Sequence, residues 1–161
     1  MNNKHMKVIE MDDLRLRQAT RNDLNAMIAL LANDKLGAGR EAPGDPAYAK
    51  AFAEIENDPN NEIWVIENDQ TPVLGVLQLT FIPGLSRLGA KRAMIESVRV
   101  ADELQGRGVG RWFFEQMIAR ARDRGAVLVQ LTSDKTRPDA IRFYESLGFV
   151  ASHEGFKLKL D

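Results

Sequence analysis

The sequence predicts one α/β domain in which helices cover a mixed sheet. Segments rich in β-forming residues alternate with amphipathic helical segments in the order β-α-α-β-β-β-α-β-α-β-β, which is typical of layered α/β domains. The chain has 161 residues, 44% of them hydrophobic, which is the size and apolar content of one packed domain. A long amphipathic helix near residue 115 lies between two strand candidates, so those two strands could be parallel.

The predicted strands are either rich in β-branched and aromatic residues or alternate between apolar and polar positions. The last two are short, and they follow the final predicted helix. The strand candidates are residues 14–19, 62–67, 73–82, 92–100, 126–132, 149–153 and 156–160.

The predicted helices are marked by residues that favour helix starts and stops. Thr20 can cap the first helix, and Pro46 suits the first position of the second. Gly125 and Gly148 end the last two. The glycine- and proline-rich segment 36–46 is expected to be a loop. The helix candidates are residues 20–34, 46–57, 109–124 and 138–148.

Composition excludes several classes of function. The chain has no cysteine, so disulfides, thiolate metal sites and a cysteine nucleophile are excluded. The two histidines lack partners at metal-ligand spacing, and we expect no metal. The formal net charge of -1 gives no reason to expect nucleic acid. No apolar run approaches the roughly 20 residues that span a bilayer, so no membrane partner is expected.

The beginning of the chain is polar and lacks the apolar centre of a signal peptide. Together with the absence of cysteine, this fits a cytoplasmic location. We expect residues 1–13 to form a flexible tail and residues 14–161 to form the single domain.

Residues 105–110, QGRGVG, place three glycines where a strand is expected to become a helix. The first N–H groups of a helix lack intrahelical partners, and the helix dipole adds partial positive charge there. Gly106, Gly108 and Gly110 would let an anion approach these groups, and Arg107 and Arg111 add charge. This pattern favours a pyrophosphate site. A sharp turn that binds nothing is the alternative, because short glycine motifs are weak signals.

Two other phosphate loops do not match. A Walker A loop requires Lys followed by Ser or Thr after its glycines, and none follows here. A dinucleotide-binding fingerprint requires a third glycine at the position that Arg111 occupies.

The chain resembles the GCN5-related N-acetyltransferase (GNAT) family over roughly residues 14–160. Gln105, Gly108 and Gly110 match the family signature Gln/Arg-x-x-Gly-x-Gly/Ala. Ala140, Tyr144 and the Leu-Gly-Phe of residues 147–149 resemble its second landmark. The resemblance implies a twisted, mostly antiparallel sheet of about six to seven strands with a splayed central pair, flanked by about four helices.

The resemblance implies acetyl-CoA as co-substrate, without metal. Its pyrophosphate would lie on the backbone of residues 105–110, and its pantetheine arm would bond to the free edge of the 92–100 strand. Many members carry asparagine where this chain has Arg137, so that contact is open, and Ser133 also borders the cofactor. The residues expected to bind the cofactor are Val98, Arg99, Val100, Gln105, Gly106, Arg107, Gly108, Val109, Gly110, Arg111, Ser133 and Arg137.

Glu96 is the predicted general base. Strand alternation would place it on one face with Met94, Val98 and Val100, where apolar neighbours would partly desolvate the carboxylate. In many family members a similar glutamate is the base. The alternatives are that Glu96 anchors the substrate amine, faces solvent or pairs with an arginine.

Tyr144 is the predicted general acid, because the resemblance implies that its phenol protonates the departing thiolate. The alternative is an aromatic residue packed on a helix face beside Phe143.

The acceptor is expected to be the primary amine of a small molecule, attacking the thioester directly. Arg40, Glu41 and Phe81 are the candidate acceptor-binding residues. A peptide or protein amine, or a catalytically silent acyl-CoA sensor, are the alternatives. Members of the family are often dimers, so a homodimer is possible.

Overall fold

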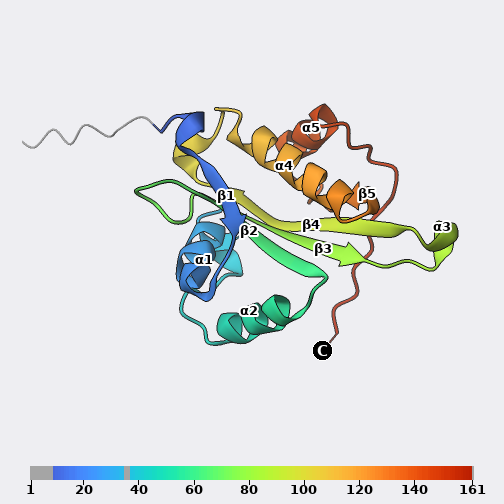
Figure 1. The fold of residues 1–161 in the computed structure, drawn as a ribbon, viewed down its shortest axis with the longest axis horizontal. Coiled ribbons are helices and arrows are strands. Elements are labelled where there is room, and N and C mark those ends of the chain that lie inside the picture. The colour runs from blue at the N-terminus through green and yellow to red at the C-terminus, as the bar shows by residue number, and fades with distance from the viewer. Residues whose placement is uncertain (1–8, 35–36, 161) are drawn as a thin grey trace, which may run out of the picture.

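Helices cover both faces of a five-stranded sheet in the computed structural model of the chain, which describes residues 9–34 and 37–160 (Figure 1). The strands lie side by side in chain order. Neighbours from β1 to β4 are antiparallel, and β5 runs parallel to β4, so the predicted mixed, mostly antiparallel sheet is confirmed. The strands are β1 (Arg15–Gln18), β2 (Asn61–Glu67), β3 (Gly75–Ile82), β4 (Lys91–Val100) and β5 (Ala126–Gln130).

Two helices lie on each side of the sheet. In Figure 1, α1 and α2 lie below it, and α4 and α5 lie above it. Helix α4 connects the parallel strands β4 and β5, as the sequence predicts. The helices are α1 (Leu24–Ala32), α2 (Ala47–Asn57), α3 (Ser86–Gly89), α4 (Val109–Asp123) and α5 (Pro138–Ser146). Short 3-10 turns are η1 (Met11–Asp13), η2 (Arg21–Asp23), η3 (Gly37–Gly39) and η4 (Asp102–Leu104).

The larger hydrophobic core lies between the sheet and α4. Alternate side chains of β3, namely Leu77, Leu79 and Phe81, are at most 2% exposed and belong to one cluster with Phe113 and Phe114 of α4. Each such buried side chain contributes about 1.5–3 kcal/mol of hydrophobic stabilisation. The core therefore fixes α4 across the strands, which places its first turn beside the end of β4.

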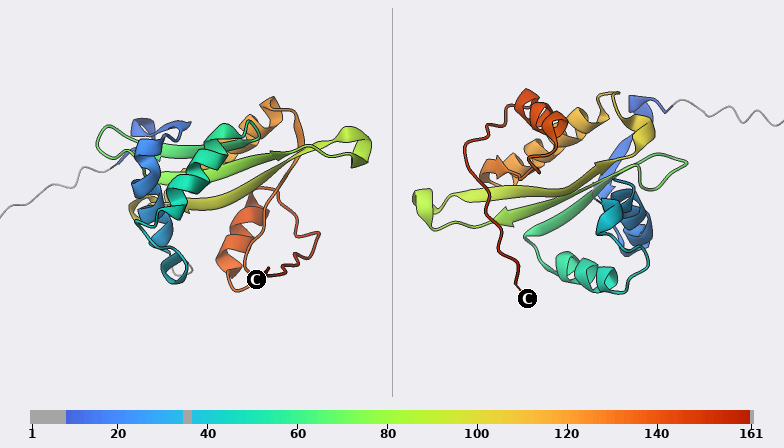
Figure 2. Two further views of the ribbon diagram at one scale, coloured as in Figure 1. Left: turned by 90° about the horizontal axis from the view of Figure 1, so that it is seen from below. Right: turned by 180° about the vertical axis from the view of Figure 1, so that it is seen from behind.

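The sheet has fewer strands than the six to seven expected. Residues 149–160 form no β-ladder with another strand, and Figure 2 shows them as an extended trace beyond α5. Phe156 and Leu158 are 93% and 87% exposed. The predicted strands at 149–153 and 156–160 are therefore wrong. Alternating apolar residues give a segment strand character, but a strand also requires a partner edge, which these residues do not engage.

Strand β4 contains a bulge that overturns the predicted alternation. The β3–β4 register shifts between Val76 and Gln78, and Ser97 has φ 53°, which is unusual for a residue with a side chain. Beyond the bulge, Val98 and Val100 pack against the core on the α4 side. Glu96 is exposed and does not share their face. Strict alternation fails because the inserted residue reverses the faces that follow it.

Strands β4 and β5 separate after a short paired segment. Their pairing runs from Lys91 and Ala126 to Met94 and Gln130, whereas β4 continues to Val100 beside β3. The backbone groups of residues 95–100 that face away from β3 therefore have no strand partner. This is the splayed pair that the family resemblance implies.

A buried ion pair joins β1 to the turn before α1. Arg17 donates from Nη1 and Nη2 to the two carboxylate oxygens of Asp23 at 2.7 and 2.8 Å. Asp23 is 4% exposed, and its Oδ2 also accepts hydrogen bonds from the N–H and hydroxyl of Thr20. The Arg17 hydrogen bond, more than any other contact, holds the pKa of Asp23 at about 2, well below its ordinary value. The pair therefore stabilises the fold only while Asp23 is ionised.

We expect Asp23→Asn to lower the free energy of unfolding at pH 7 by about 2 kcal/mol, because Arg17 loses its buried carboxylate. The lowered pKa of Asp23 means that this stabilisation is present above pH ~4 and is lost as the pH falls towards 2. Urea unfolding of both proteins between pH 7 and pH 2.5 measures the difference, which should shrink at low pH. Asp69→Asn is the matched control, because Asp69 pairs with Arg15 in solvent. A constant difference across this range, or an equal effect of Asp69→Asn, would contradict the assignment.

Candidate active site

The first turn of α4 presents a set of free backbone N–H groups. Gly106 and Gly108 have φ 72° and 81°, which glycine adopts without strain, and Gly108 is the N-cap of α4. In the described part of the chain, the backbone N–H groups of residues 106–111 donate no hydrogen bond to the protein. Because the helix dipole adds positive charge at this end, the turn is suited to an anion. The predicted strand-to-helix glycine turn is confirmed as a structure.

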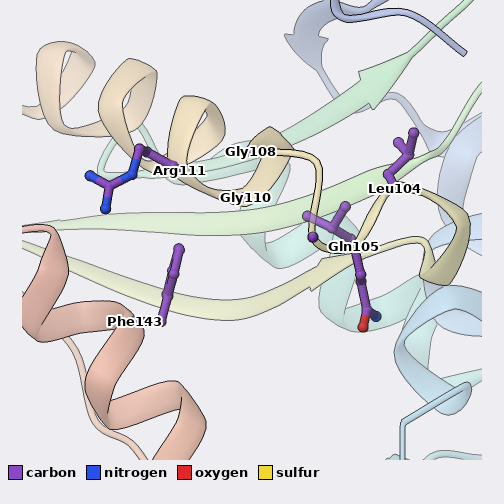
Figure 3. Close-up of a pocket in the computed structure, with 8 residues that line it drawn as sticks. Leu104, Gln105, Gly108, Gly110, Arg111 and Phe143 are labelled. Carbon is purple, nitrogen blue, oxygen red and sulfur yellow. The ribbon is translucent and has the colours of Figure 1, made fainter.

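A groove of about 330 Å³ opens beside this turn (Figure 3). It lies between the end of β4, the glycine turn and α5. Figure 3 shows Gln105 and Arg111 on opposite sides of it and Phe143 on the α5 side. Its lining residues are Val100, Leu104, Gln105, Gly106, Gly108, Gly110, Arg111 and Phe143.

These features suit the chemistry of coenzyme A. The free N–H groups of the α4 turn suit a diphosphate, and the unpaired edge of β4 suits an arm that carries amides. Gly110 lies where α4 approaches α5, because a Cβ at this position would be in van der Waals contact with Cζ of Phe143, at 3.6 Å. The two predicted parts of the cofactor site, the glycine turn and the end of β4, are thus brought together.

Several predicted cofactor side chains are already engaged elsewhere. Arg107 donates to the carbonyl of Ile9, and Arg99 contacts the carbonyl of Asn33 and the carboxylates of Asp34 and Asp102. Neither residue is among those that line the groove. Val109 is 2% exposed, so its side chain is not available to a ligand.

Arg111 and Gln105 remain at the groove although each has a protein partner. Arg111 donates from Nη2 to Oγ of Ser146 at 2.8 Å, which ties α4 to α5. Gln105 donates to Asp102 at 2.6 Å. Both hydrogen bonds join exposed side chains, so a ligand can replace either protein partner with little loss of stability.

Residues 133 and 137 lie between β5 and α5. The hydroxyl oxygen of Ser133 is buried without a hydrogen-bond partner among the described residues, an arrangement that costs stability unless something else supplies a partner. Arg137 directly precedes α5 and lies close enough to Tyr144 for its charge to affect that phenol.

Tyr144 belongs to an aromatic cluster under the groove. Its ring lies 5.6 Å from the rings of Phe114 and Phe143, and 6.1 Å from that of Phe149. Burial raises the pKa of Tyr144, and the charge of Arg137 opposes this only in part. The phenol is therefore protonated at neutral pH, as a proton donor must be.

Glu96 is exposed at the start of the splay, so the predicted desolvation of its carboxylate is wrong. It lies opposite Gln78 of β3. No ion pair of Glu96 occurs within residues 9–34 and 37–160, which also argues against the arginine pairing considered from the sequence. The bulge at Ser97 directly follows it and separates its face from that of Val98.

The structure does not bring the three predicted acceptor residues together. Arg40 and Tyr48 both hydrogen-bond to Glu41, at 2.8 Å each, so this carboxylate is satisfied within the loop and α2. Phe81 is 2% exposed and carries the guanidinium of Arg124 over its ring at 4.3 Å. It lies in the core, because its parity in β3 places it on the α4 face with Leu79.

Sequence reasoning missed two groups of residues near the site. Leu104 and Phe143 line the groove, and their apolar character alone did not separate them from core residues. Asn61, Gln78 and Thr80 form a hydrogen-bonded group beside Glu96. Polar residues at alternate positions of an apolar strand were the available signal for the second group.

Comparison with known proteins identifies the family. The model described as "Acetyltransferase (GNAT) family" matches residues 24–149, so this chain belongs to that family of acyltransferases, whose members use acetyl-CoA as co-substrate. No curated protein matches the chain significantly.

Three solved structures illustrate the similarity. A transcriptional regulator from Bacillus halodurans C-125 is 47% identical, with a TM-score of 0.86 over 91% of this chain and 99% of that one. An acetyltransferase from Trypanosoma brucei is 25% identical, with a TM-score of 0.76 over 92% and 100%. Glucosamine-6-phosphate N-acetyltransferase from Arabidopsis thaliana is 20% identical, with a TM-score of 0.74 over 92% and 99%, and shares the fold.

The residues that the structure describes contain no group of three or more His, Cys, Asp or Glu side chains able to hold a metal ion. Within the same ranges, no helix has both the length and the apolar character needed to cross a bilayer.

We expect Gly108→Asp to weaken coenzyme A binding at least about tenfold, because a carboxylate at the N-cap repels the diphosphate and its bulk enters the turn. Isothermal titration calorimetry with coenzyme A measures this. Gly44→Asp is the matched control, since Gly44 has a similar φ of 92° and equally open surroundings in a distant loop. Equal affinity of the wild type and Gly108→Asp would exclude the turn as the diphosphate site.

We expect Tyr144 to ionise above the ordinary tyrosine pKa of about 10, because burial disfavours the phenolate. The absorbance of the wild type and Tyr144→Phe at 295 nm, compared over an alkaline titration, isolates this transition. The chain has only one other tyrosine, which both proteins retain. A difference signal centred at or below pH 10 would show that the phenol is not buried.

Proposed function

We propose that the protein transfers an acetyl group from acetyl-CoA to the primary amine of a small molecule by direct attack. One observation carries the proposal: the unpaired edge of β4 runs from the splay, where Glu96 has no ion pair among the described residues, to the free N–H groups of the α4 turn. The edge and the N–H groups suit the donor, and Glu96 suits a cationic acceptor.

The protein would hold the donor mainly through its backbone. The N–H groups of residues 106–111 would bind the diphosphate, with Arg111 adding charge. The edge of β4 around Val98 and Val100 would bond to the pantetheine amides, as in strand addition. Bound acetyl-CoA supplies the acetyl thioester. Ser133 and Arg137 would border the same molecule, and the unpartnered hydroxyl of Ser133 favours a ligand contact there.

Glu96 would first bind the ammonium group of the acceptor and then accept its proton at the carboxylate, directly or through water. Its exposure allows an acceptor to reach it, and it has no competing ion pair among the described residues. Charge attraction would orient the amine before the proton moves.

Tyr144 would donate the proton of its Oη to the departing sulfur. The phenol is half-buried, and because burial raises its pKa it keeps this proton at neutral pH. Its packing against Phe114 and Phe143 would hold the ring in one orientation, which is the usual role of packing around a proton donor.

A second candidate function is a catalytically silent sensor of acyl-CoA. It is favoured by one observation, the name transcriptional regulator of the Bacillus halodurans relative. A thiol-release assay with acetyl-CoA and a panel of amines, amino acids, aminoglycosides, polyamines and peptides separates the two. Thiol release with small amines supports the enzyme, release with peptides alone supports a peptide acetyltransferase, and silence with tight coenzyme A binding supports the sensor.

We also propose a cytoplasmic location and a homodimer. The first rests on the absence of cysteine, and the second on the family resemblance. Light scattering coupled to size exclusion tests the dimer, and fractionation of cells that express the full chain tests the location.

We expect Glu96→Gln to lower the turnover number by about 10²-fold or more while coenzyme A affinity is unchanged, because the amide cannot accept the proton. Steady-state thiol release and calorimetry measure the two quantities. Glu56→Gln, an exposed position on α2, is the control and should retain full activity. Wild-type turnover in Glu96→Gln would remove this residue from the mechanism.

A further inference from the structure

A strip of polar side chains crosses the α1/α2 face of the sheet where β4 and β5 separate. One row runs across four strands: Asn61 lies opposite Thr80, Thr80 opposite Met94, and Met94 opposite Gln130. In the next row, Gln78 lies opposite Glu96. We call Asn61, Gln78, Thr80 and Glu96 the polar strip. Side chains directly opposite on neighbouring strands have Cβ atoms about 5 Å apart, so one small molecule can contact several of them.

The polar strip is half-buried rather than covered. Asn61, Gln78 and Thr80 are partly exposed, and Glu96 is exposed. Elsewhere on this face, Val76 is buried in the smaller core with Met27 of α1 and Phe52 of α2. The helices therefore close one part of the face, and the strip remains accessible next to the splay.

A chain of hydrogen bonds fixes the orientation of the strip. Asn61 Nδ2 donates to Asp58 Oδ2 at 2.7 Å, so the amide oxygen of Asn61 points the other way. That oxygen accepts from Thr80 Oγ1 at 2.7 Å and from Gln78 Nε2 at 3.1 Å. Hydrogen bonds from the backbone of Asn60 and the side chain of Asn61 lower the pKa of Asp58, which keeps it an acceptor.

This orientation leaves mainly acceptor atoms available to a ligand. A hydroxyl has one hydrogen, and Thr80 gives it to Asn61, so Oγ1 can only accept from a ligand. Gln78 turns its amide nitrogen to Asn61 and keeps Oε1 free. Ionised Glu96 has acceptor oxygens only. A ligand that matches the strip must therefore supply hydrogen-bond donors and one positive charge.

A cation borders the strip on the β5 side. Arg92 donates from Nη1 to Oε1 of Gln130 at 3.3 Å. It lies two residues before Met94 on β4, so both side chains are on the same face of the sheet. Its charge disfavours a second ammonium group in this direction, while its remaining N–H groups suit an oxygen atom.

We propose that the polar strip is the acceptor subsite and that it selects primary amines that carry hydroxyl groups on nearby carbons, such as amino sugars and amino alcohols. This rests on the proposed function. The ammonium binds Glu96, and a hydroxyl donates to Thr80 Oγ1 or Gln78 Oε1. An amine without hydroxyls covers these half-buried acceptors without pairing them, and sites built to bind a hydroxyl discriminate strongly against such ligands. A diamine supplies no hydroxyl, and the charge of Arg92 disfavours a second ammonium group on the β5 side.

Three probe amines test this selection: glucosamine, cyclohexylamine and 1,4-diaminobutane. We expect kcat/KM with acetyl-CoA to be about 10²-fold or more higher for glucosamine than for either of the others. Equal values for glucosamine and cyclohexylamine, or a preference for 1,4-diaminobutane, overturn the inference while leaving the acetyltransferase proposal intact. The inference is also overturned if the protein acetylates peptides but none of the three amines.

The variant Thr80→Val removes the hydroxyl and keeps the side-chain shape. We expect it to raise KM for glucosamine about tenfold with little change in kcat, and to leave cyclohexylamine kinetics unchanged. Thr71→Val, in the loop between β2 and β3, is the matched control. An equal loss for both amines indicates damage to the fold and overturns the specific role of Thr80, as does no loss at all.

Binding measured without turnover separates this inference from the proposed function. Saturation-transfer NMR in the presence of coenzyme A should detect glucosamine on the wild type and a weaker signal on Thr80→Val. If glucosamine binds in this way but no amine is acetylated, the subsite stands and the proposed function fails. If amines are acetylated but glucosamine binds both proteins equally, the proposed function stands and the subsite fails.

Discussion

The site depends on the separation of β4 from β5 after the Met94–Gln130 pair. Strand β4 keeps its antiparallel partner β3 on one side to the end, so the strand is held rigidly. On its other side, the backbone groups of residues 95–100 that face away from β3 have no strand partner. Unpaired backbone groups are costly when buried and are a template for pairing when accessible. The open edge of β4 is therefore both the weakness of this sheet and the feature from which a binding site can be built.

Helix α4 places free N–H groups, which suit an anion, beside the end of this open edge. The helix crosses from β4 to β5, and its buried side chains Phe113, Phe114 and Met117 fix it over the sheet. Its first turn therefore lies next to the end of β4, where Val100 and the glycine turn line one groove. Glycine is required at two positions in particular, because Gly106 and Gly108 have the left-handed backbone conformation of the turn that precedes α4. Core packing thus positions a polar site that contains few side chains.

Much of this arrangement could be predicted from local sequence signals. Helix α4, the strands β1 to β5 and the glycine turn follow from patterns within a few residues, such as Gly108 before an amphipathic segment. The separation of β4 from β5 was implied by the resemblance to the family, since no local pattern encodes where two strands stop pairing. The glycine turn could be predicted from its own glycines, whereas the open edge of β4 contains no glycine that marks it.

The sequence predictions were wrong where contacts between distant segments determine the position of a residue. The bulge at Ser97 changed the face of Val98, and it depends on the register with β3. Phe81 was expected at the acceptor site, but parity in β3 places it in the core. The alternation of residues 156–160 suggested a strand, yet no edge pairs with them. The hydrogen-bonded strip from Asn61 to Thr80 spans two strands, so no single segment reveals it.

A crystal structure of the protein with coenzyme A would show where the diphosphate binds. We expect diphosphate oxygens about 3 Å from backbone nitrogens within residues 106–111, with the pantetheine arm along the free edge of β4 beyond Ile95. A diphosphate bound elsewhere, with these nitrogens in contact with solvent alone, would contradict it. The roles of Glu96 and Tyr144 would then lose their basis, because both depend on where the thioester lies.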